Sequence, residues 1–241
     1  MRAVFRHELH SYFTTPVGYV FLIMYTLLAG VVFVFVNIGQ EMSASMNLLF
    51  SGLQLPFMLI APLLTMRLFA EERRMRTDQL LLTSPVRVHA IVLGKMLAAA
   101  VMLLIAMGLT LLFPMAISRW AQVSARQVAA VFLGYYLLNT AMLSVGVVLS
   151  SLCVNQITAA VITLGVNLLL YLCEHYVTPQ LSVAYLAPVQ SALQWLPSSA
   201  RLGDFASGVI SLADVVYFLA FTALMLFFTC RVIERRRFAK G

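Results

Sequence analysis

The sequence predicts an all-helical membrane protein that crosses the bilayer six times. Of its 241 residues, 62% are hydrophobic and only 10% are charged, whereas a soluble domain carries about 25% charged residues. The apolar residues form six long stretches, and a helix needs about 20 such residues to cross a hydrocarbon core of about 30 Å. Charged residues gather between these stretches and at the chain ends, so a soluble globular domain is excluded.

The first element is expected to be a helix over residues 2–13 that lies flat on the membrane surface. Its apolar residues recur at the spacing of one helix face, namely Phe5, Leu9, Tyr12 and Phe13. Its basic residues fall on the other side, namely Arg2, Arg6 and His10. Such an amphipathic pattern is typical of an interfacial helix, and Pro16 ends it because proline disfavours helix at the preceding residue.

The six spans follow in order. They are expected at residues 17–38, 48–66, 90–117, 128–149, 157–176 and 215–230. Residues 178–213 are broken by Pro179, Pro188 and Pro197 and offer no further span, so we expect short helices there that lie on the outer surface or dip into it. Ser211, three residues before Asp214, has the spacing of a capping box at the start of the last span.

The distribution of lysine and arginine predicts the orientation. Six spans place both termini on the side of the loop after the second span, and this side collects thirteen of the sixteen basic residues: Arg2, Arg6, Arg67, Arg73, Arg74, Arg76, Arg87, Lys95, Arg231, Arg235, Arg236, Arg237 and Lys240. The other side has Arg119, Arg126 and Arg201. The positive-inside rule makes the first side cytoplasmic, so the net charge of +7 reflects topology and we expect no nucleic-acid partner.

The charged stretch from Arg67 to Lys95 separates the second span from the third. An ionised side chain at the centre of a membrane helix costs about 2.5–3.5 kcal/mol, so we interpret this stretch as a cytoplasmic loop that includes Glu71 and Glu72. Within it, Thr77 or Asp78 can cap a short helix that Pro85 ends. Three leucines in that helix, Leu80, Leu81 and Leu82, need a partner surface to cover them.

Two weaker patterns are compatible with an enzyme or a metal site. Glu71-Glu72-Arg73-Arg74-Met75-Arg76 spells EExxxR, a pattern of one class of intramembrane metalloprotease, but no histidines lie on neighbouring spans to complete a catalytic site. Cys173-Glu174-His175 offers sulfur and imidazole ligands that suit copper, but one cysteine and one histidine do not close a site. We therefore expect no catalytic residue and no metal site.

Several segments resemble a known family. FAEERRMRTDQLLLTSPV, followed by IVLGK, closely resembles the loop between the second and third spans of type-2 ABC exporter permeases, and the gliding-motility-associated permeases are the nearest match. The resemblance extends to HELHSYFTTPVGYV, SSLCVNQITAAV and ASGVISLADVVYFL. It implies a permease of the bacterial cytoplasmic (inner) membrane, with an N-terminal elbow helix, a cytoplasmic coupling helix and short extracytoplasmic helices between spans five and six.

The resemblance also implies where a separate ATPase docks. Glu71 and Glu72 would meet the ATPase surface, residues 77–84 would form the coupling helix, and the turn between spans four and five would add a smaller contact. The residues implied are Glu71, Glu72, Thr77, Asp78, Leu80, Leu81, Leu82, Asn155 and Gln156.

The chain itself has no GxxxxGK[ST] loop for phosphate binding, so we expect no cofactor in this chain. ATP and Mg would be held by a dimer of ATP-binding subunits. Six spans make half of such a transporter, so a second permease subunit is implied. It would be identical or homologous, and the subfamily resemblance suggests one with a large extracytoplasmic domain.

Polar residues within the spans suggest the nature of the cargo. The candidate cavity-lining residues are Tyr25, Gln54, Asn139, Thr140 and Asn167. None of them is ionised at neutral pH, which argues against an ion-coupled carrier and favours an amphipathic or lipid-linked cargo. The alternative is a mechanotransmission subunit, which would pass ATPase motion to an extracytoplasmic partner without moving cargo.

Overall fold

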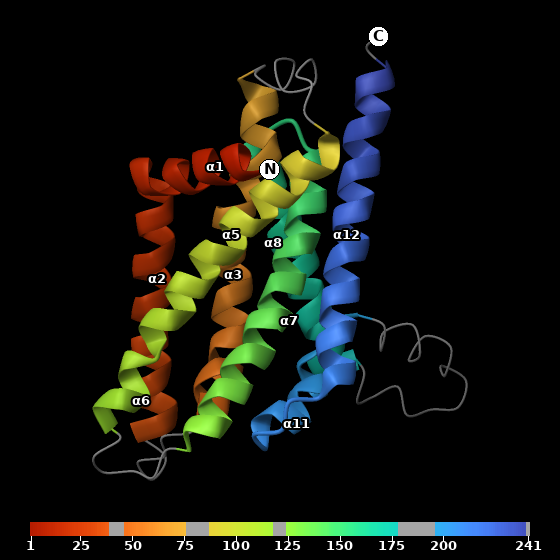
Figure 1. Cartoon of the computed structure of the whole chain (residues 1–241). Coiled ribbons are helices and arrows are strands. Elements are labelled where there is room, and N and C mark those ends of the chain that lie inside the picture. The colour runs from red at the N-terminus through yellow and green to blue at the C-terminus, as the bar shows by residue number, and fades with distance from the viewer. Residues whose placement is uncertain (39–45, 76–86, 118–123, 178–195, 240–241) are drawn as a thin grey trace.

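The computed structural model describes residues 1–38, 46–75, 87–117, 124–177 and 196–239 (Figure 1). Throughout these ranges the regular structure is helical. The elements are α1 (Arg2–Thr14), α2 (Pro16–Val32) with its π-helical continuation η1 (Phe33–Ile38), α3 (Met46–Arg74), α5 (Val88–Thr110), α6 (Leu112–Ile117), α7 (Ala125–Leu152), α8 (Gln156–Leu172) with η2 (Cys173–Val177), the 3-10 helix η4 (Ser199–Leu202), α11 (Gly203–Ala206) and α12 (Leu212–Ala239). Six helices in the described ranges are long and apolar enough to cross a membrane, as the sequence predicts.

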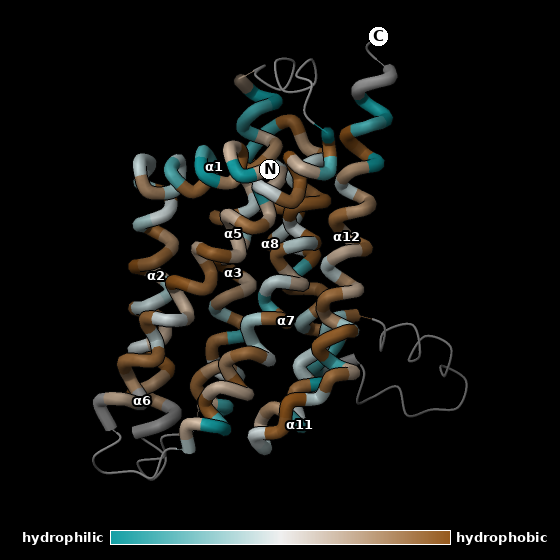
Figure 2. Tube along the Cα trace, in the orientation of Figure 1, coloured by the Kyte–Doolittle hydropathy of each residue, from teal (hydrophilic) through white to brown (hydrophobic). Residues whose placement is uncertain are grey.

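The bundle has a core of three helices and a periphery of three. In the most apolar window of α3, α5 and α7, 61% to 67% of the residues are buried, against 17% to 28% for α2, α8 and α12. Figure 2 shows hydrophobic residues along the length of the helices and hydrophilic ones gathered towards the two ends. The peripheral helices therefore present apolar side chains outward, as expected where lipid is the surrounding medium.

Helix α1 lies across one end of the bundle, and both chain termini are found at that end (Figure 1). The Tyr12 hydroxyl donates a hydrogen bond of 2.6 Å to the Leu64 carbonyl in α3. Burial raises the pKa of this phenol, so it remains a protonated donor. At the turn into α2, a Cβ atom on Gly18 would collide with the Tyr12 carbonyl. The turn from the flat helix into the first span therefore requires glycine there.

The interpretation of Glu71 and Glu72 as loop residues is wrong. Helix α3 continues through both of them to Arg74, and α5 begins at Val88, so Lys95 is two turns inside a helix. The charges are tolerated there because they lie near the bundle end and are paired with one another. Helix α3 also runs continuously past Pro56 and Pro62.

The described part of the stretch before α12, residues 196–211, packs closely against the bundle. Leu202 and Phe205 are buried, and both lie against Gly134 of α7, where an added Cβ would be 3.0 Å from Leu202 Cδ2 and 2.8 Å from Phe205 Cγ. This part of the stretch contains two four-residue helical elements, η4 and α11. The rest of the predicted extracytoplasmic segment, residues 178–195, lies outside the described residues.

Candidate functional site

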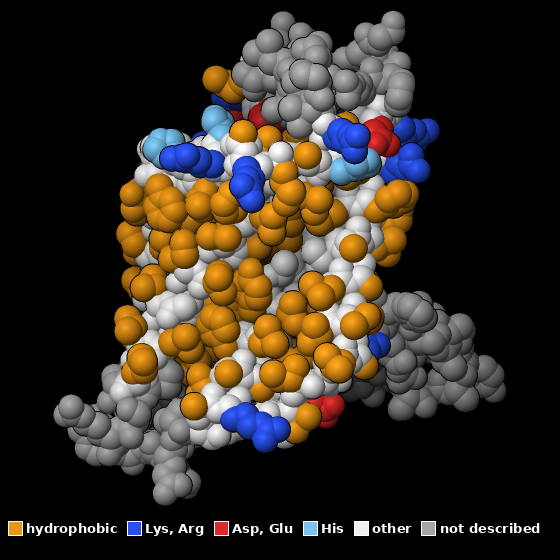
Figure 3. All heavy atoms as spheres, in the orientation of Figure 1, with side chains coloured by type: hydrophobic (Ala, Val, Ile, Leu, Met, Phe, Trp, Pro, Cys, Tyr) orange, Lys and Arg blue, Asp and Glu red, His pale blue; other side chains and the backbone are white. Residues whose placement is uncertain are grey.

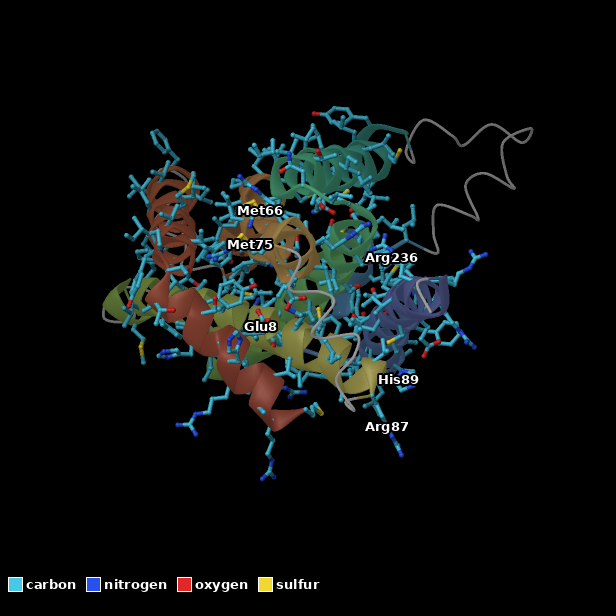
Figure 4. The ribbon with its side chains drawn as sticks, turned by 90° about the horizontal axis from the view of Figure 1, so that it is seen from above. Glu8, Met66, Met75, Arg87, His89 and Arg236 are labelled. Atoms are coloured by element: carbon cyan, nitrogen blue, oxygen red, sulfur yellow. The ribbon has the colours of Figure 1, made fainter. Side chains whose placement is uncertain are left out.

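Three charged side chains from three helices meet at the α1 end of the bundle. Lys95 Nζ in α5 lies 2.5 Å from Glu8 Oε1 in α1 and 2.7 Å from Glu72 Oε1 in α3. The lysine side chain is 1% exposed, and its ammonium also lies 5.2 Å from the centre of the Phe69 ring. In Figure 4, which looks onto this end, Glu8 lies between α1 and α5. We call Lys95, Glu8 and Glu72 the Lys95 cluster.

A glycine beside Lys95 permits this arrangement. A Cβ atom on Gly94 would lie 3.1 Å from the Val4 side chain and 3.2 Å from the Phe5 nitrogen, which is tighter than ordinary van der Waals contact. The missing side chain therefore allows α1 to rest closely on α5. Because Glu8 lies one helical turn after Val4, on the same side of α1, this close approach brings its carboxylate onto the ammonium.

The Lys95 cluster is a strong constraint on the three helices. Removing one partner of a buried ion pair typically costs 3–5 kcal/mol, because it leaves an uncompensated charge. Two carboxylates share one ammonium here, so loss of the lysine would leave two like charges close together. Relative displacement of α1, α3 or α5 must therefore either preserve these contacts or exchange them.

A second pair ties α3 to the junction of α1 and α2. The Arg67 guanidinium donates to both oxygens of Glu71, at 2.6 Å and 3.0 Å, which is the bidentate geometry that makes arginine–carboxylate pairs strong. Its third contact is a hydrogen bond of 2.7 Å to the Thr15 hydroxyl. Glu71 therefore has a defined partner at the same end of α3 as Glu72.

The end of α7 is joined to the end of α3. The Ser150 hydroxyl accepts from the Phe69 nitrogen at 3.3 Å and donates to the Met66 carbonyl at 3.3 Å. Arg73 donates to the carbonyls of Leu152 and Cys153 at 3.1 Å and 2.9 Å, which satisfies acceptors that a helix C-terminus leaves open.

A contact from α12 completes this end. The Arg236 guanidinium donates to the Leu152 carbonyl at 3.3 Å, and Figure 4 shows Arg236 reaching this end from α12. Asn155 then caps α8, its side chain accepting from the Ile157 nitrogen at 3.2 Å. Helices α3, α7, α8 and α12 thus meet at the turn between α7 and α8.

The predicted ATPase-coupling residues that the structure describes all lie at this end. Glu71 and Glu72 occupy the last turns of α3, and Asn155 and Gln156 occupy the start of α8. The other five predicted residues lie outside the described residues, between the end of α3 and the start of α5: Thr77, Asp78, Leu80, Leu81 and Leu82. Sequence reasoning missed Glu8, Arg67 and Lys95, of which Lys95 had the clearest signal as a lone cation in an apolar run.

The candidate cavity-lining residues are largely buried. Tyr25, Gln54, Asn139 and Asn167 are all at most 3% exposed, while the partly buried Thr140 donates to the Tyr136 carbonyl in its own helix. The Tyr25 hydroxyl, Gln54 Oε1, Asn139 Oδ1 and both polar atoms of Asn167 have no hydrogen-bond partner among the described residues. Each such atom typically costs about 1–3 kcal/mol.

Two of these unpaired side chains, Gln54 and Asn167, lie at the interface of α3, α7 and α8. Gly146 of α7 marks it, since an added Cβ there would meet the Thr65 hydroxyl at 2.6 Å and the Thr163 methyl at 2.9 Å. Helical periodicity places Gln54 on the same face of α3 as Thr65, and Asn167 on the same face of α8 as Thr163. The unpaired atoms of Thr65 and Thr163 extend the series. We call these four side chains the polar seam.

The opposite end of the bundle has its own anchor. A Glu174 carboxylate oxygen in η2 accepts from the Ser198 hydroxyl at 2.9 Å and from the Ser199 nitrogen at 2.6 Å, with further contacts to the Ser199 hydroxyl and the Ala200 nitrogen. Arg201 then lies 3.7 Å from Asp214 and 4.0 Å above the Tyr217 ring. Within the described ranges no group of three histidine, cysteine or acidic side chains could hold a metal, and Glu174 instead positions the start of η4.

Replacing Glu174 with alanine is expected to release this turn, because four contacts lose their common acceptor. Trypsin should then cleave after Arg201 faster in the purified protein, by about tenfold if roughly 1–2 kcal/mol of local stability is lost. Mass spectrometry of the fragments measures this. His175→Ala is the matched control, because it leaves Glu174 in place and removes a ring whose contacts are with Tyr171, by stacking and at 3.3 Å from the Tyr171 carbonyl. Equal cleavage of the two variants would contradict the anchoring role.

Comparison with known proteins identifies the family. The model of a family described as "ABC-2 family transporter protein" matches residues 36–230. No curated protein matches the chain significantly. The family match begins within η1 and ends within α12, so it covers the bundle from α3 onward but not α1 or α2, and the helical bundle with six candidate spans is consistent with it. The chain therefore belongs to the ABC-2 transporter family, as a membrane permease subunit that works with an ABC ATP-binding subunit.

Proposed function

We propose that this chain is the permease subunit of an ATP-driven exporter and that the ATP-binding subunits dock at the α1 end of the bundle. The observation that carries this proposal is the Lys95 cluster. It joins the two helices that flank residues 76–86, α3 and α5, to each other and to α1. A force applied to residues 76–86 would be transmitted to α1, α3 and α5 through the buried ammonium of Lys95.

The contacts around the Lys95 cluster supply a path for the motion. Displacement of the α3 end would move α7 through Ser150 and Arg73, and α1 through Glu8 and Tyr12. Closure of an ATPase dimer would thereby shift α3 together with its neighbours, in the manner of a packed element with two discrete positions. In this proposal the α1 end is cytoplasmic, in agreement with its excess of basic residues, and the membrane is the bacterial inner membrane.

The polar seam bears on the cargo. Its groups are amides and hydroxyls without formal charge, and several lack a partner in the single chain. We propose that movement of α8 relative to α3 and α7 exposes these groups to the polar part of an amphipathic or lipid-linked molecule. A second permease subunit would complete the pathway, and the segments matching gliding-motility permeases favour one with a large extracytoplasmic domain.

One observation favours the mechanotransmission alternative. The seam is tightly packed at Gly146, where even a methyl group would meet Thr65 and Thr163 at less than 3.0 Å. If this packing persists throughout the ATPase cycle, the bundle would transmit force to an extracytoplasmic partner without moving cargo. Stimulation of the ATPase by added cargo distinguishes the two, since only export predicts it.

Copurification tests the docking site. The tagged chain, expressed with its gene neighbours and purified in mild detergent, is expected to retain an ATP-binding subunit, and Leu81→Asp is expected to lose it by placing a charge in the apolar surface that docks. The matched control is Leu212→Asp, because Leu212 is 77% exposed at the opposite end of the bundle. Retention of the ATPase by Leu81→Asp, or its equal loss from both variants, would contradict docking at residues 77–84.

A further inference from the structure

Helix α1 has an unusual division of charge between its two sides. Glu8 is its one acidic residue, and it faces inward onto Lys95. The basic side chains all face outward and are exposed: Arg2, Arg6, His7 and His10. The outer face of α1 therefore carries two arginines and two histidines, with no acidic side chain from the helix itself beside them.

The same face is hollowed. An open depression of about 680 Å³ is lined by Ala3, Arg6, His7, Leu9, His10 and Phe13. Its lining combines one guanidinium and two imidazoles with apolar side chains, which suits an amphiphilic molecule better than a hydrated ion.

The outer face of α1 lies beside a broad apolar surface. Figure 3 shows basic side chains along the upper border of a broad apolar surface. The Phe13 ring packs edge-on against Tyr19 of α2, with ring centres 6.2 Å apart, and the exposed side chains below it are apolar: Val20, Ile23, Met24, Leu27 and Val31. A molecule bound at Arg6 would thus have its polar group at the border and its tail along α2.

We propose that the outer face of α1 binds the headgroup of an anionic phospholipid, and that this binding sets how strongly the ATPase segment is coupled to the bundle. Arginine matches phosphate oxygens with paired donors, and clusters of basic residues beside a membrane segment attract anionic lipids. The acyl chains continue along the apolar surface of α2. A zwitterionic lipid has the same phosphate but offers no net charge to balance Arg2 and Arg6.

The coupling follows from the two faces of one short helix. The outer face carries the lipid contacts, and Glu8 on the inner face bonds to the ammonium that also holds Glu72 at the end of α3. A lipid that fixes the position of α1 therefore fixes one anchor of the Lys95 cluster. This regulatory half rests on the proposed function, whereas the binding half does not.

The test uses the whole transporter complex in nanodiscs of phosphatidylcholine, alone or mixed with phosphatidylglycerol. Native mass spectrometry measures the phosphatidylglycerol retained by the complex, and phosphate release measures the ATPase rate. The wild type is expected to retain phosphatidylglycerol and to hydrolyse ATP severalfold faster in its presence. In Arg6→Gln/His10→Gln, retention is expected to fall about fivefold from loss of the Arg6 charge, and the stimulation is expected to disappear while the rate in phosphatidylcholine stays at the wild-type value.

The control is Arg235→Gln, which removes an exposed cation from α12 outside the depression. It is expected to retain lipid and stimulation as the wild type does. Equal retention in the double variant and the wild type would overturn the binding site, as would an equal loss in Arg235→Gln. Lipid lost without any change in stimulation would overturn the regulatory half. Failure of the ATPase to assemble in any lipid would instead count against the proposed function, and native mass spectrometry of the permease without its ATPase would then still measure lipid retention and test the binding half.

Discussion

Replacing Lys95 with methionine is expected to destabilise the protein by about 3–5 kcal/mol, the cost of removing one partner from a buried ion pair. Glu8 and Glu72 would then face each other across the α1–α3–α5 junction without the ammonium that now lies 2.5 Å and 2.7 Å from them. Thermal unfolding in mild detergent measures the loss, followed with a thiol-reactive dye in a background where the partly exposed Cys153 and Cys173 are replaced by alanine, so that the dye reports exposure of the buried Cys230. In the assembled complex, the rate of ATP hydrolysis should also become uncoupled from movement of the permease helices.

The triple variant Glu8→Gln, Glu72→Gln, Lys95→Met separates stability from coupling. It removes all three charges together and therefore leaves no unpaired buried ion, which is what makes removal of a single partner costly, so part of the lost stability should return. Coupling should stay low if the Lys95 cluster transmits force, and should recover with stability if the cluster only holds the fold. A single Lys95→Met variant as stable as the wild type would show that the cluster contributes little.

The six spans were predictable because they depend on local composition. Length and hydropathy of a segment decide whether it can cross the bilayer, and neither requires knowledge of a distant contact. The helical N-terminal segment was predictable for a similar reason, since the spacing of Phe5 and Leu9 is periodic. Its docking against α3 through Tyr12 could not be derived, because the Leu64 acceptor lies 52 residues further along the chain.

The charged stretch was harder to interpret, and the error has a physical cause. Charge alone suggested a loop that includes Glu71 and Glu72, because unpaired ions are expelled from hydrocarbon. The structure keeps them in helices by pairing them, and the partners of Lys95 are 87 and 23 residues away. A single lysine in the apolar run IVLGKMLAAA was a signal for a buried carboxylate partner, but it could not indicate which one.

The contact of η4 and α11 with α7 was also beyond sequence reasoning. The segment looked irregular because of its prolines, and nothing in its composition showed that Leu202 and Phe205 would be buried. The contact depends on two residues that are far apart in the sequence, Gly134 in α7 and Phe205 about 70 positions later. Neither is informative without the other.

Replacing Gly134 with valine is expected to displace this segment from α7. The Cβ atom alone would lie 2.8 Å from Phe205 Cγ and 3.0 Å from Leu202 Cδ2, and overpacking of this kind costs about 1–3 kcal/mol even before the two methyl groups are added. Thermal unfolding should show the loss of stability, and trypsin should cleave after Arg201 faster, since Arg201 directly precedes the displaced Leu202.

Two matched variants make this result specific. Gly165→Val adds the same side chain to an exposed position of α8 where a Cβ atom meets nothing within 4 Å, so it is expected to leave both measurements unchanged. Phe205→Ala in the Gly134→Val background removes the ring that causes the closest contact and should recover part of the stability. If Gly134→Val behaved like Gly165→Val, the segment from Ser199 to Ala206 would not rest on α7. The anchor at Glu174 would then be its main attachment to the described bundle.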